Sequence, residues 1–144
     1  MSIRVEKITD KAAFDQAVQI RKTVFVIEQK VDPNDEYDQF EETSHHFLAK
    51  LDGKPAGAAR WRMTEKGIKL ERFAVLKKFR GKGIGQALVS AVLEDLRSYS
   101  LSEGQVVYLH AQLNAVSLYS KFGFRPIGDL FEECNIQHYK MELA

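Results

Sequence analysis

The chain has 144 residues, of which 44% are hydrophobic and 28% are charged, and this composition is typical of one globular domain spanning residues 1–144. The 21 basic residues nearly balance the 20 acidic ones, and the resulting net charge of +1 argues against nucleic acid as the main partner. The single cysteine, Cys134, excludes an internal disulfide and a cysteine-based metal cluster. No stretch reaches the ~18 apolar residues that span a bilayer, and the first ten residues lack a signal-peptide core. We therefore expect a cytoplasmic protein that uses neither membrane nor metal.

The first third of the chain predicts one strand, one helix and a loop. Residues 3–8 (IRVEKI) alternate apolar and charged side chains, as a half-buried strand does. Asp10 stands in an N-cap position before a helix over residues 11–29, whereas residues 31–44 are acidic and contain a proline, which predicts a loop. The apolar row of the helix comprises Ala13, Ala17, Ile20, Val24 and Ile27.

The remainder predicts six strands and two helices. The expected strands cover 45–52, 54–63, 68–75, 105–113, 125–133 and 136–143, and the expected helices cover about 83–100 and 115–122. Asn114 can cap the second of these helices, and Gly123 can end it. The order β-α-β-β-β-α-β-α-β-β predicts an α/β (α+β) fold in which helices cover a mixed sheet.

Three glycines within five residues precede the long helix, in the segment FRGKGIGQAL (79–88). The start of a helix exposes unpaired N–H groups and the positive end of the helix dipole, so it attracts phosphate. Glycine lets a phosphate approach these amides, and Arg80 and Lys82 add positive charge. The spacing fits neither a Walker loop nor the dinucleotide fingerprint. The segment therefore predicts a pyrophosphate site, with a tight turn that merely starts a helix as the alternative.

The pattern Arg-x-x-Gly-x-Gly at residues 80–85 resembles the acetyl-CoA pyrophosphate motif of the GNAT acetyltransferase superfamily. The resemblance continues through LERFAVLKKFRGKGIGQALVSAVLEDL and through LHAQLNAVSLYSKFGF, which ends in the Tyr-x-x-x-Gly-Phe signature of that family. The front, RKTVFVIEQKV, and the tail, FEECNIQHYKM, resemble the ElaA/YjcF-like branch. The likeness thus covers nearly the whole chain.

This resemblance implies a GNAT fold with six or seven largely antiparallel strands and about four helices. It also implies acetyl-CoA as the co-substrate, with its pantetheine arm held between two central strands that splay apart. The implied coenzyme-binding residues are Phe73, Ala74, Val75, Arg80, Gly81, Lys82, Gly83, Ile84, Gly85, Gln86, Asn114 and Tyr119.

Acyl transfer to an amine requires a proton acceptor for the ammonium and a proton donor for the departing thiolate. The resemblance makes Tyr119 the candidate acid, although its apolar helix also suits a core aromatic residue. Strand alternation puts residues 69, 71, 73 and 75 on one face, so Glu71 is a candidate base; an ion pair with nearby arginines is the alternative. His110 is a second candidate base, directly or through water, and a hydrogen-bonded core histidine is its alternative. A water chain would need no single base.

The acceptor pocket is expected to use charged and aromatic residues from several elements. Arg21 and Glu28 interrupt the apolar row of the first helix, which suggests a polar site facing the cleft, although a surface salt bridge explains them equally. The acidic residues around Asp35 could attract a cationic acceptor, or could simply be solvated. The candidate acceptor-binding residues are Arg21, Phe25, Glu28, Trp61, Gln112 and His138.

Together these features predict an N-acetyltransferase that moves an acetyl group from acetyl-CoA to a primary amine of a small molecule or peptide. We expect a monomer or homodimer. Two other functions remain open. The pattern R-x-x-x-F-x-x-E also resembles acyl-homoserine lactone synthases, which share the fold, and the glycine segment would equally suit a non-catalytic module that binds acyl-CoA.

Overall fold

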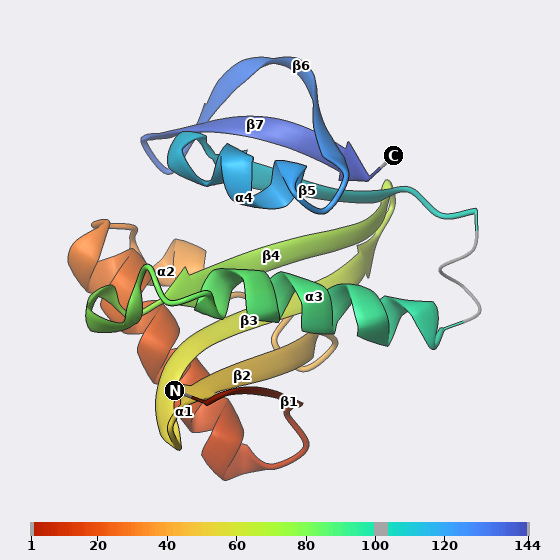
Figure 1. Cartoon of the computed structure of the whole chain (residues 1–144). Coiled ribbons are helices and arrows are strands. Elements are labelled where there is room, and N and C mark those ends of the chain that lie inside the picture. Colours follow the sequence, from red (N-terminus) through yellow and green to blue (C-terminus); the bar gives the residue numbers. More distant parts are fainter. Residues whose placement is uncertain (1, 100–103, 144) are drawn as a thin grey trace.

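The computed structural model describes residues 2–99 and 104–143, which form one mixed sheet of seven strands (Figure 1). The strands are β1 (Ile3–Lys7), β2 (His45–Leu51), β3 (Lys54–Thr64), β4 (Gly67–Val75), β5 (Val107–Gln112), β6 (Phe124–Glu133) and β7 (Ile136–Leu143). They lie in the order β1-β2-β3-β4-β5-β7-β6, and every neighbouring pair except β4 and β5 is antiparallel. The predicted α/β fold with a largely antiparallel sheet is therefore confirmed.

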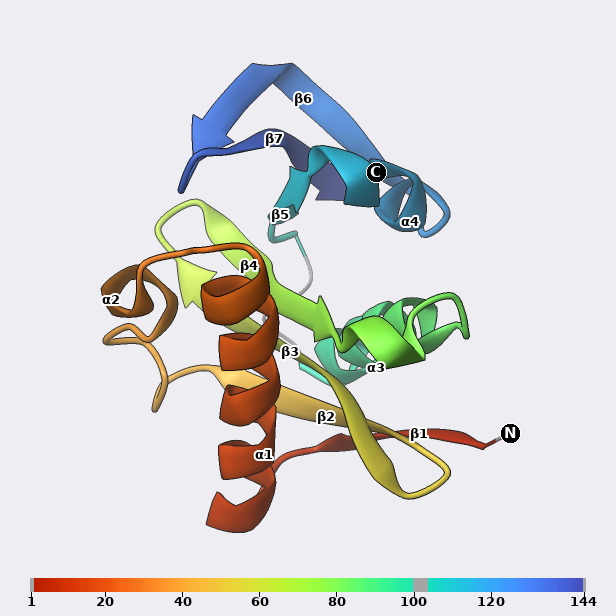
Figure 2. The same ribbon diagram turned by 90° about the vertical axis from the view of Figure 1, so that its left-hand side faces the viewer.

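Helices cover both faces of this sheet. They are α1 (Lys11–Arg21), the π-helix η1 (Lys22–Glu28), α2 (Pro33–Glu36), α3 (Ile84–Arg97) and α4 (Val116–Ser120), with short 3₁₀ turns η2 (Lys77–Phe79) and η4 (Leu113–Ala115). Helix α1 crosses one face, and α3 and α4 lie on the other (Figures 1 and 2). The predicted N-cap of α1 is confirmed, because Asp10 Oδ1 accepts a hydrogen bond of 2.8 Å from the Ala13 amide.

The helix predicted over 115–122 is shorter than expected and is not capped by Asn114. The chain leaves β5 through the 3₁₀ turn η4, so Asn114 lies inside that turn, and Ala115 occupies the N-cap position of α4. Of the predicted helix over 83–100, residue 100 lies outside the described residues. None of the helices in the described ranges is long and apolar enough to cross a bilayer.

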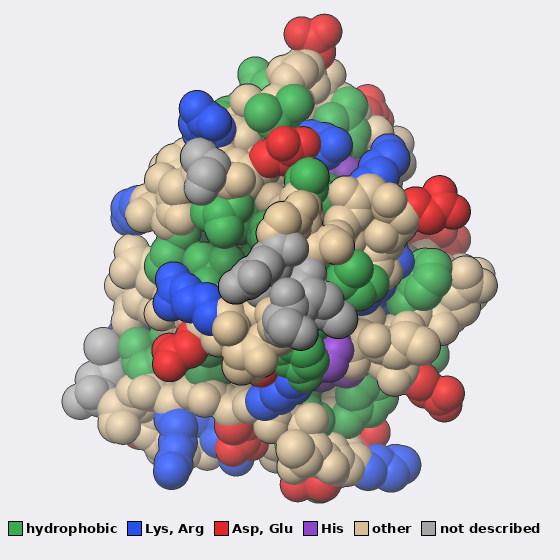
Figure 3. Space-filling model, turned by 90° about the vertical axis from the view of Figure 1, so that its right-hand side faces the viewer, with side chains coloured by type: hydrophobic (Ala, Val, Ile, Leu, Met, Phe, Trp, Pro, Cys, Tyr) green, Lys and Arg blue, Asp and Glu red, His purple; other side chains and the backbone are tan. Residues whose placement is uncertain are grey.

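Two apolar cores lie on the two faces of the sheet. The larger contains Leu88 and other residues of α3 together with Ile68 and Leu70 of β4, and the smaller packs α1 against Ala74. On the face shown in Figure 3, lysine and arginine side chains lie among aspartate, glutamate and hydrophobic side chains, in keeping with the balanced composition.

A β-bulge at Arg72 changes which residues of β4 share a face. The register with β3 shifts between Ala58 and Arg60, and Arg72 adopts a left-handed φ of 60°. Phe73 and Val75 consequently pack on the same core as Leu70. The prediction that residues 69, 71, 73 and 75 share one face of the sheet is therefore wrong. The extra residue at the bulge inverts the alternation after Glu71, so residues 73 and 75 lie on the face opposite to residues 69 and 71.

The central parallel strands separate after a short paired stretch. Only Ile68, Lys69 and Leu70 of β4 have register partners on β5, and these are Val107, Tyr108 and Leu109. Beyond these pairs β4 runs on to Val75 and β5 to Gln112, so the two strands diverge (Figure 2). The predicted splay is confirmed.

Candidate active site

A cavity of about 170 Å³ occupies the space where β4 and β5 separate. It is lined by both strands at and beyond their last shared pair, by the C-terminal end of η1, by α2, by α4 and by the β6–β7 hairpin. The predicted site residues that line it are Phe25, Glu71, Phe73, His110, Gln112, Tyr119 and His138. The splay thus brings together side chains from five separate parts of the chain.

The cavity joins the two faces of the sheet. Leu109 and Ala111 of β5 belong to the larger core, which also contains Tyr119. His110 and Gln112 alternate with them and point to the opposite face, where Gln112 exchanges amide hydrogen bonds of 2.8 and 3.2 Å with Gln29. A molecule in the gap between the strands would therefore meet Tyr119 from one side and His110 from the other.

Tyr119 is held rigidly at the cavity. Its side chain is 7% exposed, and its ring makes edge contacts with Phe73 and Phe124 at centroid distances of 5.8 and 6.2 Å. Within the part of the chain that the structure describes, the Tyr119 hydroxyl has no hydrogen-bond partner. Its oxygen atom is not completely buried, since every fully buried side-chain N or O atom there has a partner. Burial raises the pKa of the Tyr119 phenol well above its usual range. The phenol is thus fully protonated at neutral pH, and the same burial makes it a weaker acid than a solvent-exposed tyrosine.

His110 is paired with a carboxylate that the sequence analysis did not single out. Its Nδ1 lies 3.1 Å from Oε2 of Glu133, the last residue of β6. The hydrogen bond from His110 lowers the pKa of Glu133 to about 2, against the effect of burial. His138 completes the group, with Nε2 3.9 Å from the other oxygen of Glu133 and Nδ1 2.7 Å from the Ile136 carbonyl oxygen.

The glycine segment forms the open start of α3. Gly83 is the N-cap residue with a left-handed φ of 90°, and among the described residues no side chain caps the first turn. Gly81 also has a positive φ of 78°, and a Cβ there would meet nothing within 4 Å. At Gly85 a Cβ would lie 3.3 Å from Leu118, so the start of α3 packs closely on α4, which carries Tyr119. The exposed amides of this turn suit an anion.

Arg80, in front of this turn, is anchored by two partners. Its Nε donates to the Val75 carbonyl oxygen at 2.9 Å, and its two terminal nitrogens form bonds of 2.6 and 2.8 Å with the carboxylate of Glu28. The predicted partnership of Glu28 with Arg21 and its place in the acceptor pocket are therefore wrong. Glu28, at the end of η1, pairs with the glycine segment instead.

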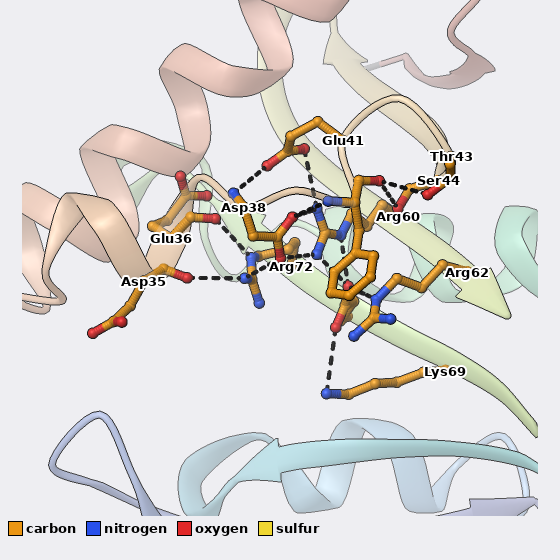
Figure 4. Close-up of polar contacts among 12 residues, drawn as sticks. Asp35, Glu36, Asp38, Glu41, Thr43, Ser44, Arg60, Arg62, Lys69 and Arg72 are labelled. Carbon is orange, nitrogen blue, oxygen red and sulfur yellow. Dashed lines mark hydrogen bonds and ion pairs between the residues drawn. The ribbon is translucent and has the colours of Figure 1, made fainter. Parts of the chain in front are cut away.

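Glu71 lies in a buried network of charges beside the cavity, and Figure 4 labels its partners Arg60, Arg62 and Lys69. Its carboxylate binds Arg60 and Arg62, and Lys69 Nζ lies 3.4 Å away. Burial raises the pKa of Glu71, but the arginines outweigh this effect and hold it below its usual value. A carboxylate with three cationic neighbours is a weak base, so the geometry favours the ion-pair alternative for Glu71.

The same network includes the predicted acidic loop. Arg21 is 1% exposed, forms ion pairs with Glu36 and Glu41, and does not line the cavity as predicted. Asp38 pairs with Arg60 and Arg72 (Figure 4). Three of the six acidic residues of this loop, Glu36, Asp38 and Glu41, thus form ion pairs with arginines, and these pairs attach α2 and the following segment to the sheet.

Trp61 and Asn114 also lie away from the cavity. Trp61 is 1% exposed in the larger core, stacks on His45 at 4.0 Å and donates a hydrogen bond of 3.0 Å to Asp95, so its predicted place in the acceptor pocket is wrong. Asn114 is exposed on η4, beside a separate shallow depression. Ala74 packs its side chain into the smaller core.

Two residues of the site escaped the sequence analysis, namely Glu133 and Gln29. A signal for Glu133 was present in the sequence, because Glu133 directly precedes the two-residue connection between the strands predicted to end at 133 and to begin at 136. Such a short connection predicts a tight hairpin that holds the end of the first strand in a defined place. Gln29 carries no such signal, because its partner Gln112 lies 83 residues away.

A mixed sheet whose central parallel strands splay beside a glycine-rich helix start defines a GNAT acyl-CoA N-acyltransferase fold. Residues 8–144 match the family model for the acetyltransferase (GNAT) domain, and the chain belongs to this family, in its ElaA/YjcF-like branch.

Two bacterial relatives support this assignment. The uncharacterised N-acetyltransferase YjcF of Bacillus subtilis (strain 168) is 38% identical over 126 residues, which are 87% of this chain and 88% of YjcF. The crystal structure of Escherichia coli ElaA superposes with a TM-score of 0.86 at 26% identity, covering 99% of this chain and 100% of ElaA. A Bacillus subtilis acetyltransferase in complex with CoA shares the fold, with a TM-score of 0.72 at 19% identity over 99% of this chain and 98% of that one.

Proposed function

We propose that the protein transfers an acetyl group from acetyl-CoA to a primary amine of a small molecule or peptide, by direct attack while both substrates are bound. One observation carries this proposal. The cavity between β4 and β5 exposes a protonated phenol, Tyr119, from one face of the sheet and an imidazole, His110, from the other. Acyl transfer needs a proton acceptor for the attacking amine and a proton donor for the departing thiolate.

The residues of the glycine segment fit the pyrophosphate of coenzyme A. Among the described residues, no side chain caps the amides of the first turn of α3. Gly81 and Gly83 lack a Cβ, so a phosphate can approach their main chain closely. Arg80 and the exposed Lys82 supply positive charge beside it. The main chain of β4 beyond Leu70 has no register partner on β5, so the carbonyl and amide groups of Phe73 to Val75 can hold the pantetheine arm. Acetyl-CoA then places its thioester carbonyl in the gap.

The catalytic roles follow from the two faces. His110 removes a proton from the ammonium of the acceptor, and the neutral nitrogen bonds to the acetyl carbon. The carbon–sulfur bond breaks, and Tyr119 transfers its proton to the departing thiolate. The attacking nitrogen, which still carries an extra proton after the attack, releases that proton as the amide forms and so restores the Tyr119 phenol, directly or through water. Glu71 keeps its ion pairs throughout and shapes the pocket wall. Phe25, Gln112 and His138 line the side from which the amine would enter.

The test is release of free thiol from acetyl-CoA in the presence of polyamines, amino acids, aminosugars, aminoglycosides and peptides. Cys134 is exposed and would itself react with a thiol reagent, so reactions without amine set the baseline. With an amine that supports turnover, Tyr119→Phe should lower kcat by about 100-fold or more while leaving affinity for CoA nearly unchanged.

The matched control is Tyr139→Phe, since Tyr139 packs on the same core from β7 but does not line the cavity. Its kcat should stay within about twofold of the wild-type value. A Tyr119→Phe enzyme with unchanged kcat would remove Tyr119 from the mechanism. Binding of CoA without turnover of any amine would instead indicate a non-catalytic module.

A further inference from the structure

We propose that Glu133 is a positioning residue that holds His110 with its proton on Nδ1, so that Nε2 is free to accept the proton of the acceptor amine. The catalytic part of this inference rests on the proposed function, whereas the hydrogen-bonding part stands on the structure alone.

The protonation pattern of His110 follows from the state of its partner. A carboxylate with a pKa of about 2 is ionised at neutral pH and can only accept hydrogen bonds. At a separation of 3.1 Å from Glu133 Oε2, Nδ1 must therefore be the donor. A neutral imidazole carries one proton, so its lone pair lies on Nε2. The carboxylate can keep the same hydrogen bond from Nδ1 when Nε2 takes up a proton, as the orienting carboxylate does in a catalytic triad.

The hairpin between β6 and β7 fixes the main chain at Glu133, whose side chain is 45% exposed. Cys134 and Asn135 both have positive φ, 51° and 63°, which gives a two-residue turn that matches the twist of its strands. Glu133 is paired with Ile136 across this turn, and His110 is paired with Lys140 of β7. Both members of the pair are therefore attached to β7, His110 through its pairing from β5 and Glu133 through its pairing from β6.

Aromatic packing restricts the histidine ring as well. Phe131, two residues before Glu133, meets the His110 ring edge-on with centroids 5.1 Å apart, and stacks on His138 at 5.7 Å. The second oxygen of Glu133 lies 3.9 Å from His138 Nε2, outside hydrogen-bond distance. The carboxylate therefore makes its short contact with His110.

Glu71 and Glu133, which both line the cavity, thus differ in function. Glu71 binds two arginines, with a lysine close by, and its charge is neutralised within the wall of the pocket. Glu133 has a histidine as its short contact, with Lys69 as a more distant cation. Glu133, unlike Glu71, is therefore placed to support a change in protonation of a neighbouring histidine.

The experiment compares Glu133→Gln, His110→Ala and the double variant in the thiol-release assay. Glu133→Gln should lower kcat by about tenfold or more with little change in the KM for acetyl-CoA, because the amide can no longer fix the proton on Nδ1. In the His110→Ala background the same change should alter kcat by less than about twofold. The control Glu132→Gln removes the same charge from the exposed neighbouring residue and should behave as wild type.

Nitrogen NMR of the His110 ring gives a readout that needs no substrate. The wild-type protein should show a protonated Nδ1 and a bare Nε2 at neutral pH, and Glu133→Gln should give a mixture of both forms. Glu133→Asp should restore part of the wild-type pattern.

Two results would overturn the inference. One is an equal loss of kcat on Glu133→Gln with and without His110, and the other is a proton on Nε2 in the wild-type spectrum. If no amine supports turnover, the proposed function fails, and the spectrum still decides whether Glu133 sets the protonation of His110.

Discussion

Replacing Glu28 by glutamine should tighten the binding of CoA. In the structure both oxygens of Glu28 bind the guanidinium of Arg80, the residue that we assign to the pyrophosphate. A diphosphate and this carboxylate would compete for the same donors. Glutamine keeps the size of the side chain but removes its charge, so Arg80 becomes available without first breaking an ion pair.

The structure also sets the size of this effect. The side chains of Arg80 and Glu28 are 40% and 37% exposed, so water and salt screen their attraction. Ion pairs of this kind contribute about 0.2–1 kcal/mol, even with two hydrogen bonds. Loss of that competition corresponds to a dissociation constant for CoA that falls by up to about fivefold. The gain should shrink as salt is added.

Titration calorimetry with CoA at about 0.05 M and about 0.5 M salt measures the effect. The control is Glu6→Gln, which removes the same charge from a pair with Lys50 on the far strands β1 and β2, where Glu6 is 42% exposed. Equal affinities for the two variants, or weaker binding by Glu28→Gln, would refute the idea that Glu28 and the pyrophosphate compete for Arg80.

Two further substitutions test how the packing and the ion pairs around the site contribute to stability. Gly57→Ala would place a Cβ 2.9 Å from the Ala74 carbonyl oxygen and 3.0 Å from Leu88 of α3, so urea unfolding should show a loss of about 1–3 kcal/mol; unchanged stability would mean that α3 yields more easily than its packing implies. Arg60→Met should cost about 3–5 kcal/mol at neutral pH, because it leaves carboxylates without their partner at a fully buried position. Burial raises the pKa of these carboxylates, but their arginine partners lower it by more, so each pKa lies below its value in the unfolded chain. Their contribution to the free energy of unfolding is therefore present above about pH 4 and is lost as the pH falls through the lowered pKa values. The difference in free energy of unfolding between wild type and Arg60→Met, measured with urea, should therefore be smaller at about pH 3 than at neutral pH. An equal difference at these two pH values would contradict the ion pairs assigned to Arg60. The carboxylates concerned are Asp38, Glu41 and Glu71.

The sequence contained most of the information on secondary structure and on the glycine segment. Period-two and helical patterns placed the strands and the long helices near their observed bounds, because each pattern reflects which side of an element meets the core. The three glycines indicated an open helix start, and Gly83 does occupy the N-cap of α3 with a left-handed backbone. These features depend on neighbouring residues, so they can be read along the chain.

The charged residues could not be assigned in the same way. Arg21, Glu28 and Glu71 all stood at positions that suggested a polar cleft, yet their partners lie up to 52 residues away along the chain. Which carboxylate an arginine meets depends on how the elements pack, and a bulge of one residue at Arg72 was enough to invert a strand face. Alternation along β4 carries no sign of that bulge.

The chain by itself thus determined the elements, their order and the open start of α3 at Gly83, since all of these arise from local backbone and side-chain preferences. Only the tertiary structure decided which titratable groups face the gap between β4 and β5. It paired Glu71 with arginines and placed Glu133 beside His110, because the free energy of a charge depends on the groups within a few ångströms of it in space.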